Sequence, residues 1–234
     1  MPKISNPISV IAHQLKNPVA IIKEYLEILS SGDAGELNIK QKEYLADTLK
    51  NINQMKRIIA DLLDVSRVEG SAYKIKGVPV DLIKITKSAV EEFSVWARTF
   101  NCEIVFNEPD NISSVLTDPE KIREVIENFI SNAIRYKGAG HGLVEISIKE
   151  KDGKISFFCK DDGMGVQPKD VKKIFHKFFR TDEAMNIDPT GTGLGLYINK
   201  AIIEGSGGKI GFKNNKGKGM TFYFTLPAVK KNAK

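Results

Sequence analysis

Two series of apolar residues, each with alternating steps of three and four, constrain the first 70 residues more than any other feature. One series begins at Ile8 and ends at Leu29, and the other begins at Leu45 and ends at Leu62. This spacing is the a/d pattern of helices that pack against each other. Because the segment Ser31–Gly35 between them is rich in turn residues, residues 1–70 are predicted to form a helical hairpin.

A hairpin of this size buries too little apolar surface to be stable alone. Two copies placed side by side make a four-helix bundle, which provides a shared core. We therefore expect a homodimer that forms through residues 1–70.

Residues 71–234 have a different sequence pattern, which predicts short strands mixed with helices. Gly70, Ser71 and Gly77 mark the boundary, and Asp118-Pro119-Glu120 is typical of the start of a helix. The mixture indicates a two-layer α+β sandwich, and the tail Lys230–Lys234 is expected to be disordered. Helices are predicted at about 81–100, 118–136 and 194–205, and strands at about 102–106, 114–116, 144–149, 155–160, 209–213 and 221–226, with a turn at 152–153.

Composition excludes several classes of protein. Hydrophobic residues make up 41% of the chain and charged residues 27%, a globular mixture rather than a disordered or fibrous one. No run approaches the roughly 18 apolar residues that span a bilayer, and residues 1–6 do not resemble a signal peptide. Membrane-spanning and secreted classes are therefore excluded for this chain, though not for a longer parent. Cys102 and Cys159 are expected to be buried small hydrophobic residues in a reducing cytoplasm.

The net charge of +6 leaves open a nucleic acid, a membrane surface or an anionic small ligand. Its position along the chain favours the last of these. Residues 1–70 hold 9 basic and 9 acidic residues, so the whole excess lies in residues 71–234. We interpret the excess of basic residues as suited to a polyphosphate ligand, with no nucleic-acid partner and no membrane contact by this segment. Strong salt-dependent DNA binding would be needed to favour a nucleic-acid binder.

His13 is a candidate reaction site because of its position and its neighbours. In the heptad count it occupies position f, the most exposed one, within the sequence His13-Gln14-Leu15-Lys16-Asn17-Pro18. A proline inside a helix costs about 3 kcal/mol and bends it, so an exposed imidazole beside a tolerated kink is a plausible site of chemistry. A solvated surface histidine without a role is the alternative.

Polar and glycine-rich motifs in the second part suit a bound nucleotide. Asn128 and Asn132 are four residues apart and share one helical face, where the amide oxygen of Asn132 suits a hard cation. Polar surface decoration is the alternative. The segments Asp161–Gly165 and Gly191–Leu196 combine glycines, which let backbone approach a ligand closely, with a strand end and a helix start. Either segment alone is also an ordinary turn, and neither is a Walker A loop.

Taken in order, these motifs resemble those of the sensor histidine kinases of two-component signalling. Residues 13–18 are similar to the phosphoacceptor box, 128–136 to the asparagine box, and the two glycine segments to the main glycine boxes of the family. Phe175 and Phe178 match the phenylalanine box and are expected to pack at the hinge of a lid formed by residues 181–190. The resemblance covers about residues 13–227 and implies an ATP-binding fold of the Hsp90 and gyrase type. A closing glycine element is matched loosely by Gly217, Gly219, Thr221 and Phe222.

The resemblance also implies a role for each residue of the ATP-binding part, with Mg²⁺ as a further cofactor. Asp161 would accept a hydrogen bond from the adenine amino group, and Tyr136 would flank the base. Asn132 would hold Mg²⁺ with Asn128 nearby, and Arg135 would face the phosphates. The backbone in contact with ATP would be that of Gly163, Gly165, Gly191, Thr192, Gly193, Leu194 and Gly195.

One position argues against plain ATP hydrolysis. The related gyrase, Hsp90 and mismatch-repair ATPases carry a water-activating glutamate where this chain has Asn128, and an amide has no useful basicity. The adjacent Glu127 lies about 100° around the helix and points elsewhere. The resemblance therefore implies phosphoryl transfer from ATP to His13, and then to an aspartate in the receiver domain of a response regulator.

Gln14 departs from the commonest family pattern, which has Glu or Asp after the histidine. Its carbonyl oxygen still accepts the imidazole N–H but cannot take a proton, so a slower autokinase is expected. Asn17, one helical turn after His13, stands where the family has a residue that orients water for dephosphorylation of the partner, which implies a phosphatase role. The alternative is an ATP-binding pseudokinase that serves as a dimeric regulatory scaffold or only as a phosphatase.

Overall fold

The computed structural model of the chain describes residues 7–69, 77–216 and 218–229. The chain divides into two compact units, Met1–Tyr73 and Lys74–Lys234, and each unit is described by itself. The predicted boundary residues Gly70 and Ser71, the motif residue Gly217 and the tail Lys230–Lys234 lie outside the described residues. None of the helices within the described ranges combines the length and the apolar character needed to cross a membrane.

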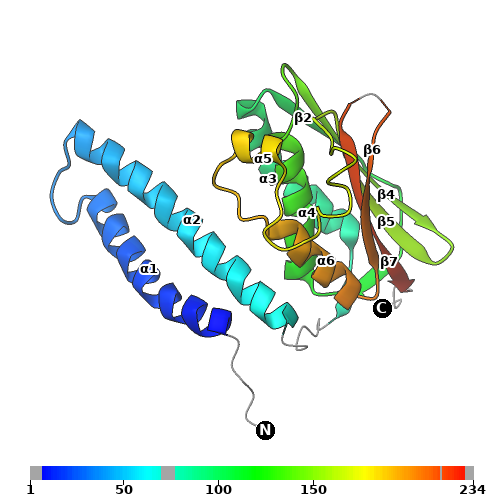
Figure 1. Cartoon of the computed structure of the whole chain (residues 1–234), viewed down its shortest axis with the longest axis horizontal. Helices are drawn as coiled ribbons and strands as arrows, with labels where there is room; N and C mark the ends of the chain where they lie inside the picture. Colours follow the sequence, from blue (N-terminus) through cyan, green and yellow to red (C-terminus); the bar gives the residue numbers. More distant parts are fainter. Residues whose placement is uncertain (1–6, 70–76, 217, 230–234) are drawn as a thin grey trace, which may run out of the picture. The chain divides into compact units, whose positions relative to one another are not determined.

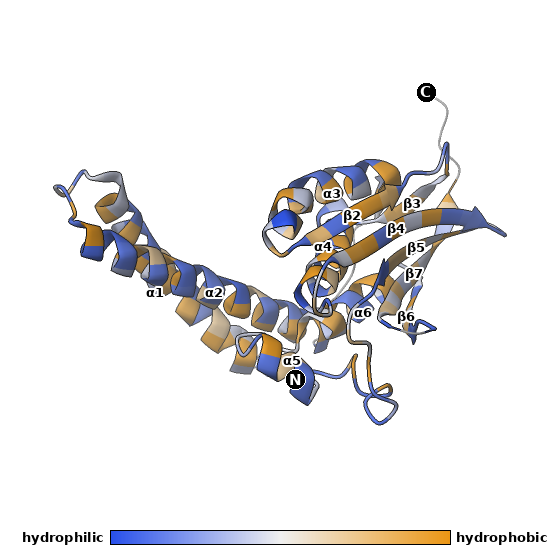
Figure 2. Ribbon diagram, turned by 90° about the horizontal axis from the view of Figure 1, so that it is seen from above, coloured by the Kyte–Doolittle hydropathy of each residue, from blue (hydrophilic) through white to orange (hydrophobic). Residues whose placement is uncertain are grey.

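The first unit is the predicted hairpin of two long helices, α1 (Pro7–Ser31) and α2 (Ile39–Glu69) (Figures 1 and 2). α1 continues through Pro18 as one helix. In the turn, Gly32 and Gly35 have φ of 88° and 109°, a left-handed backbone that glycine adopts without a Cβ penalty. At the start of α2, the Gln41 N–H donates to Asn38 Oδ1 and the Asn38 N–H donates to Gln41 Oε1, both at 2.9 Å, which is a reciprocal helix cap.

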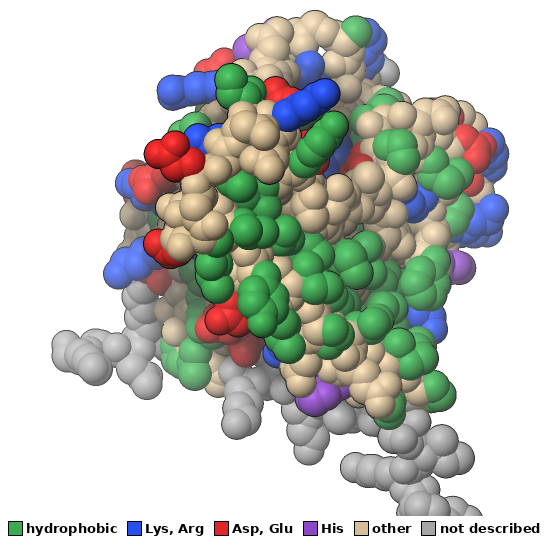
Figure 3. Space-filling view, turned by 90° about the vertical axis from the view of Figure 1, so that its left-hand side faces the viewer, with side chains coloured by type: hydrophobic (Ala, Val, Ile, Leu, Met, Phe, Trp, Pro, Cys, Tyr) green, Lys and Arg blue, Asp and Glu red, His purple; other side chains and the backbone are tan. Residues whose placement is uncertain are grey.

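The two helices pack along one stripe of side chains from each helix. The stripe on α2 belongs to the predicted apolar series, whereas the stripe on α1 does not. Residues seven apart form the core of the hairpin, Ala12 and Val19 on α1 and Ile52 and Ile59 on α2. The assignment of the α1 series to this contact is wrong, because the small Ala12 and its stripe face α2 while the larger residues lie beside that stripe. Hydrophobic side chains accordingly gather on the surface of the hairpin (Figure 3). The exposed members of the series are Ile11, Leu15, Ile22, Tyr25 and Leu29.

The second unit mixes strands and helices, as predicted. Most predicted elements agree with the observed ones to within a few residues. The elements are β1 (Val78–Val80), α3 (Leu82–Thr99), β2 (Cys102–Asn107), β3 (Ser114–Thr117), α4 (Pro119–Arg135), β4 (Gly142–Lys151), β5 (Lys154–Asp161), α5 (Asp182–Ile187), α6 (Gly195–Gly205), β6 (Lys209–Asn214) and β7 (Met220–Val229).

These strands form one sheet of seven, in the order β1-β3-β7-β5-β4-β2 with β6 beside β7. β2 runs parallel to β4, whereas the other described pairs are antiparallel. α3, α4 and α6 cover one face of this sheet (Figure 2). The arrangement confirms the predicted two-layer α+β sandwich.

The middle of α4 is fixed to the sheet by an aromatic cluster. The Phe129 ring stacks on Phe222 with 5.1 Å between centroids, and Phe157 stacks on Phe224 at 5.0 Å. Phe129, Phe157 and Phe224 are fully buried, and burial of such side chains stabilises the fold by roughly 1.5–3 kcal/mol each. This contact sets the rotation of α4, and with it the direction of the polar residues along the edge of the helix.

Two elements lack a prediction from the sequence. β1 has three residues, and α5 has six residues, of which none is buried. Neither element is long enough to show the apolar periodicity that predicts a strand or a helix, and α5 buries no side chain that would produce such a pattern.

Candidate functional site

Asn128 and Asn132 lie one turn apart on α4, and both side chains are half-buried. Asn132 Nδ2 donates to Asn128 Oδ1 at 3.0 Å, and Asn199 Nδ2, from α6, donates to the same oxygen at 3.2 Å. An amide oxygen has two lone pairs, so Asn128 Oδ1 is saturated. Asn132 Oδ1 accepts no hydrogen bond from the described residues, and it is therefore the amide oxygen that this pair offers to a cation.

The start of α6 lies directly against Asn128. A Cβ on Gly195 would overlap Asn128 Nδ2, so only glycine lets the helix begin this close to α4. The N-cap residue Leu194 makes no side-chain cap, which leaves N–H groups of the first turn for an anion. Glu127, the neighbour of Asn128, pairs with Arg123 on its own helix and points away, as expected.

The segment Gly191–Leu196 leads from the predicted lid into α6. Thr192 Oγ1 accepts a hydrogen bond from the Leu194 N–H at 3.2 Å. The Leu194 side chain is buried in the core, so this residue offers a ligand its backbone alone. Gly193 has φ of 69°, and a Cβ there would press against the backbone of Phe178 and Phe179.

Asp161 ends β5 with only 6% of its surface exposed. Its Oδ1 accepts hydrogen bonds from the N–H groups of Gly163 at 2.9 Å and Met220 at 3.2 Å. Burial raises the pKa of Asp161 from its ordinary 3.8 to about 6, because it outweighs the opposite effect of these two donors. Oδ2 accepts no hydrogen bond from the described residues, so one carboxylate oxygen is available to a donor on a ligand.

Tyr136 and the glycine segment after Asp161 are in contact. A Cβ on Gly163 would overlap the carbonyl oxygen of Tyr136, and the Met164 N–H donates to the same oxygen at 3.3 Å. Tyr136 is the C-cap of α4. The end of α4 and the end of β5 therefore meet, which brings two residues predicted to hold one base to the same place.

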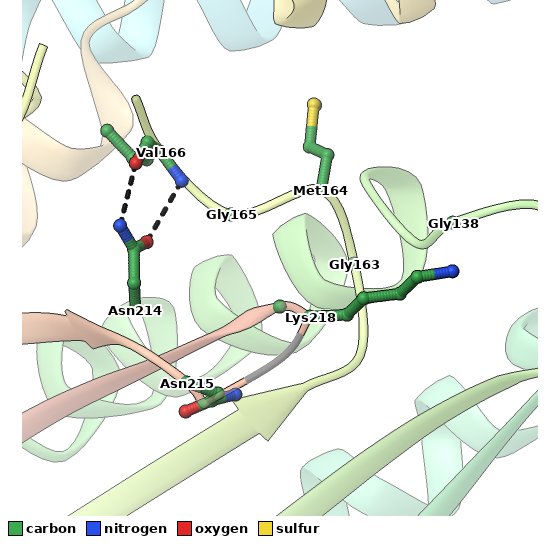
Figure 4. A pocket seen from close by; sticks show the side chains of 9 residues that line it. Gly138, Gly163, Met164, Gly165, Val166, Asn214, Asn215 and Lys218 are labelled. Atoms are coloured by element: carbon green, nitrogen blue, oxygen red, sulfur yellow. Dashed lines mark hydrogen bonds between the residues drawn. The ribbon is translucent and has the colours of Figure 1, made fainter. Parts of the chain in front are cut away.

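A pocket of about 390 Å³ opens beside this segment, between it and the turn from β6 to β7 (Figure 4). Asn214 holds the far end of the segment, because its Nδ2 donates to the Val166 carbonyl at 2.7 Å and its Oδ1 accepts from the Val166 N–H at 3.0 Å. The pocket thus has one wall from a predicted binding loop. Its lining residues are Gly138, Gly163, Met164, Gly165, Val166, Asn214, Asn215, Lys218 and Gly219.

Asn215 ties the same turn to Asp161. Its Nδ2 donates to the Asp161 carbonyl at 2.9 Å, and its Oδ1 accepts from Thr221 Oγ1 at 2.7 Å. The sequence prediction missed both Asn214 and Asn215. The signal available for them was their position directly before the closing glycine element.

The predicted lid, residues 181–190, contains α5 and is fastened by Arg180. The guanidinium donates to the carbonyl oxygens of Ala184 at 2.7 Å and Gly191 at 3.0 Å, and also to that of Asp188. Arg135 Nη1 lies 3.0 Å from Asp188 Oδ2. The arginine expected to face phosphate is therefore engaged in an ion pair with the lid.

Of the two phenylalanines expected to pack at the lid hinge, Phe175 packs against the sheet, whereas Phe178 does not pack in the core. The Phe175 ring lies edge-on to that of Phe212, with 6.1 Å between centroids. Phe178 is 60% exposed and has φ of 61°, a left-handed backbone that is rare for a bulky residue. Its backbone lies against Gly193, and its side chain is exposed to solvent.

His13, Gln14 and Asn17 lie on α1 and are exposed, whereas the adjacent Ala12 is buried against α2. The exposure expected from position f is confirmed for His13. These three residues belong to the first compact unit, and the nucleotide motifs belong to the second.

The donor set suits magnesium that arrives with a polyphosphate. Among the described residues there is no group of three or more His, Cys, Asp and Glu side chains that could hold a metal ion. Mg²⁺ is usually held by one or two protein oxygens and completed by water and substrate phosphates. A single amide oxygen fits that pattern: Asn132 Oδ1, next to Asn128, which itself lies against the start of α6.

Two protein families match the chain. The His Kinase A (phospho-acceptor) domain matches residues 5–71, and the histidine kinase-, DNA gyrase B-, and HSP90-like ATPase family matches residues 117–230. Sensor histidine kinase WalK of Bacillus subtilis is 32% identical over 218 residues, which are 93% of this chain and 35% of WalK. Sensor-like histidine kinase SenX3 of Mycobacterium tuberculosis is 31% identical over 220 residues, 94% of this chain and 52% of SenX3. The chain thus spans about a third to a half of these relatives.

Solved structures show the same fold. Full-length ShkA in complex with AMPPNP has a TM-score of 0.81 and 25% identity, over 97% of this chain and 46% of ShkA. The catalytic domain of histidine kinase ThkA has a TM-score of 0.56 and 28% identity, over 66% of this chain and 99% of that domain. With a phosphoacceptor-type hairpin followed by an ATPase-type sheet, matched in the same order in one chain, this protein belongs to the sensor histidine kinases.

Proposed function

We propose that this chain is an ATP-dependent protein-histidine autokinase, which phosphorylates His13 and passes the phosphoryl group to an aspartate of a response regulator. The observation that carries the proposal is the saturated amide of Asn128. A hydrolytic ATPase needs a base here to activate water, but Asn128 Oδ1 already accepts two hydrogen bonds and Glu127 is paired with Arg123. Without such a base, an exposed nucleophile such as His13 is the better acceptor.

Residues 71–234 are the ATP-binding catalytic domain in this proposal. Asp161 Oδ2 accepts the adenine amino N–H, and Tyr136 flanks the base. Asn132 Oδ1 holds Mg²⁺, which offsets the charge of the phosphates when it is bound. Backbone groups of Gly191–Gly195 and of the glycine segment 163–165 approach the nucleotide closely.

At His13 a neutral imidazole nitrogen attacks the γ-phosphorus of ATP. A nitrogen–phosphorus bond forms as the bond to the bridging oxygen breaks, and ADP leaves. Gln14 Oε1 accepts the N–H of the other ring nitrogen and fixes the tautomer. Gln14 cannot take the proton of this N–H, so the proton passes to solvent.

Residues 1–70 serve in this proposal for both phosphotransfer and dimerisation. The larger apolar residues of α1, among them Ile11 at 54% exposure and Ile22 at 45%, remain in water in the single chain. Exposed apolar surface of this kind is typical of an interaction site. A second hairpin packed on it completes a four-helix bundle and buries these side chains.

Free, buried Cys102 and Cys159 support a cytoplasmic location, where thiols stay reduced.

Incubation of the full chain with ATP labelled on the γ-phosphorus tests the proposal. We expect acid-labile, base-stable label that is lost in His13→Ala and retained in His176→Ala, which removes another exposed histidine. Transfer of the label to a receiver domain tests the second step. An unlabelled wild-type chain that still binds ATP would contradict the autokinase and favour the pseudokinase scaffold or phosphatase, the alternative that Gln14 supports.

A further inference from the structure

Asn199 is an amide in an apolar place. It lies on α6 beside Ile198, with Ile202 and Ile203 one turn further on, and all four residues are buried, Asn199 with 1% of its surface exposed. Burying an amide is unfavourable unless hydrogen bonds replace those to water. The hydrogen bond that Asn199 makes to α4 is therefore what offsets the burial of its amide.

That contact joins α6 to the asparagine pair of α4. Asn199 Nδ2 donates to Asn128 Oδ1 at 3.2 Å, and Asn132 Nδ2 donates to the same oxygen at 3.0 Å. On its other side, Asn128 Nδ2 lies against Gly195, where a Cβ would not fit. Two donors, one from α4 and one from α6, therefore orient the amide of Asn128, and the start of α6 closes the space at its other end.

The orientation of Asn128 determines the orientation of Asn132. An amide rotated by 180° exchanges its donor and its acceptor. If Asn128 turned over, its Nδ2 would face Asn132, and Asn132 would have to turn its own Oδ1 inward to accept. The oxygen that suits a hard cation would then be used up inside the protein.

We infer that Asn199 is a positioning residue for magnesium binding: by donating to Asn128 it keeps Asn128 Oδ1 facing Asn132, and so keeps Asn132 Oδ1 directed at the cation. The inference deepens the proposed function and rests on it. It assigns the cation one protein amide oxygen rather than two, and it places the supporting group on a different helix. Residues that support metal ligands in this way typically change metal affinity by about 10–100-fold when replaced.

Two replacements and one control test this in the full chain. Asn199→Leu removes the donor at similar volume, and Asn199→Asp replaces it by an acceptor of the same shape, which favours the turned-over Asn128. Ile202→Val is the control, because it loosens the packing of the same helix in a residue one turn away from Asn199. Thermal unfolding of each variant identifies any protein that fails to fold.

The measurement is binding of AMPPNP by calorimetry, in EDTA and over a magnesium titration. Magnesium should increase the affinity for AMPPNP, and we expect both Asn199 variants to need about ten times more magnesium than the wild type for half of this increase. The affinity for AMPPNP in EDTA should change less than twofold. Ile202→Val should keep the wild-type magnesium dependence. In ¹⁵N spectra, the side-chain amide of Asn132 should shift on magnesium addition in the nucleotide-bound wild type and not in Asn199→Asp.

The outcomes separate the inference from the proposed function. A folded Asn199→Leu or Asn199→Asp with wild-type magnesium dependence would overturn the inference, as would an equal change in Ile202→Val. A wild-type chain that binds nucleotide without any effect of magnesium would also overturn it and leave nucleotide binding intact. A wild-type chain that binds no nucleotide at all would overturn the proposed function and the inference together.

Discussion

Replacement of Asp161 by Asn is expected to separate the stability of the second unit from its affinity for ATP. The pKa of the native carboxyl is about 6, against 3.8 ordinarily, because the group is buried. The native state therefore binds more protons than the unfolded chain between about pH 4 and 6, and the free energy of unfolding falls as the pH rises through this window. At 1.36 kcal/mol per pH unit, the difference corresponds to roughly 3 kcal/mol.

Asparagine keeps the local hydrogen bonds of Asp161 and removes its charge. An amide Oδ1 accepts from Gly163 and Met220 as the carboxylate does. At pH 7 the variant should be more stable than the wild type by up to about 3 kcal/mol, and it should lack the loss of stability between pH 4 and 6. In the proposed binding mode, the ATP affinity of the variant should fall about 10–100-fold, because Nδ2 replaces Oδ2 and two donors then face each other at the adenine amino group.

Urea unfolding at pH 4 and pH 7, with calorimetric titration of ATP at pH 7, measures both effects. Asp162→Asn is the matched control, because the neighbouring carboxylate accepts from the Leu143 N–H at 3.1 Å and is only half-buried. Asp162→Asn should change both the pH dependence of the stability and the ATP affinity less than Asp161→Asn does. Wild-type ATP affinity in Asp161→Asn, or an unaltered dependence of its stability on pH, would refute the reasoning.

Four further replacements give separate tests. Gln14→Glu should raise the initial rate of phosphohistidine formation, since a carboxylate takes the imidazole proton; an unchanged rate of labelling would contradict this role. Asn17→Ala should slow the loss of phosphate from the partner receiver domain, and full-rate decay would exclude that function. Asp188→Asn should tighten nucleotide binding up to about fivefold in calorimetry, because Arg135 no longer has to leave an ion pair worth about 1 kcal/mol; weaker binding would show that the pair shapes the lid for the ligand. Gly195→Ala should weaken nucleotide binding roughly tenfold or more, because the new Cβ displaces Asn128, and binding within twofold of the wild type would argue against this.

The sequence was sufficient where the structural signal is local. Asp118 starts α4 as expected, accepting from the N–H groups of Glu120 and Lys121. The turn at Asp152 and Gly153 has φ of 52° and 68°, the left-handed pair that joins two antiparallel strands tightly. The asparagine pair also followed from its spacing, because four residues along a helix always share a face.

Contacts between distant residues had no such signal. Asn199 meets Asn128 across 71 positions, and Asn214 holds Val166 across 48, so these partners became visible only once the sheet brought them together. On α1 two apolar stripes satisfy the same helical period, and only packing against α2 distinguishes them. The ion pair of Arg135 likewise depends on the path of a lid that has no apolar period.

Arg180 fastens the lid through main-chain atoms, in addition to the side-chain contacts of Arg135 with Asp188 and of Gln167 with Glu183. Anchoring through the main chain leaves the sequence of α5 room to diverge. Arg180 donates to three carbonyl oxygens between Ala184 and Gly191, and α5 buries none of its six side chains. Most residues that allow a helical turn present the same oxygens. Over evolutionary time, substitutions in α5 can therefore change the charge and size of the side chains that the lid exposes while its backbone conformation is kept. Loss of the Arg180 guanidinium, in contrast, would remove all three hydrogen bonds to the lid carbonyls at once.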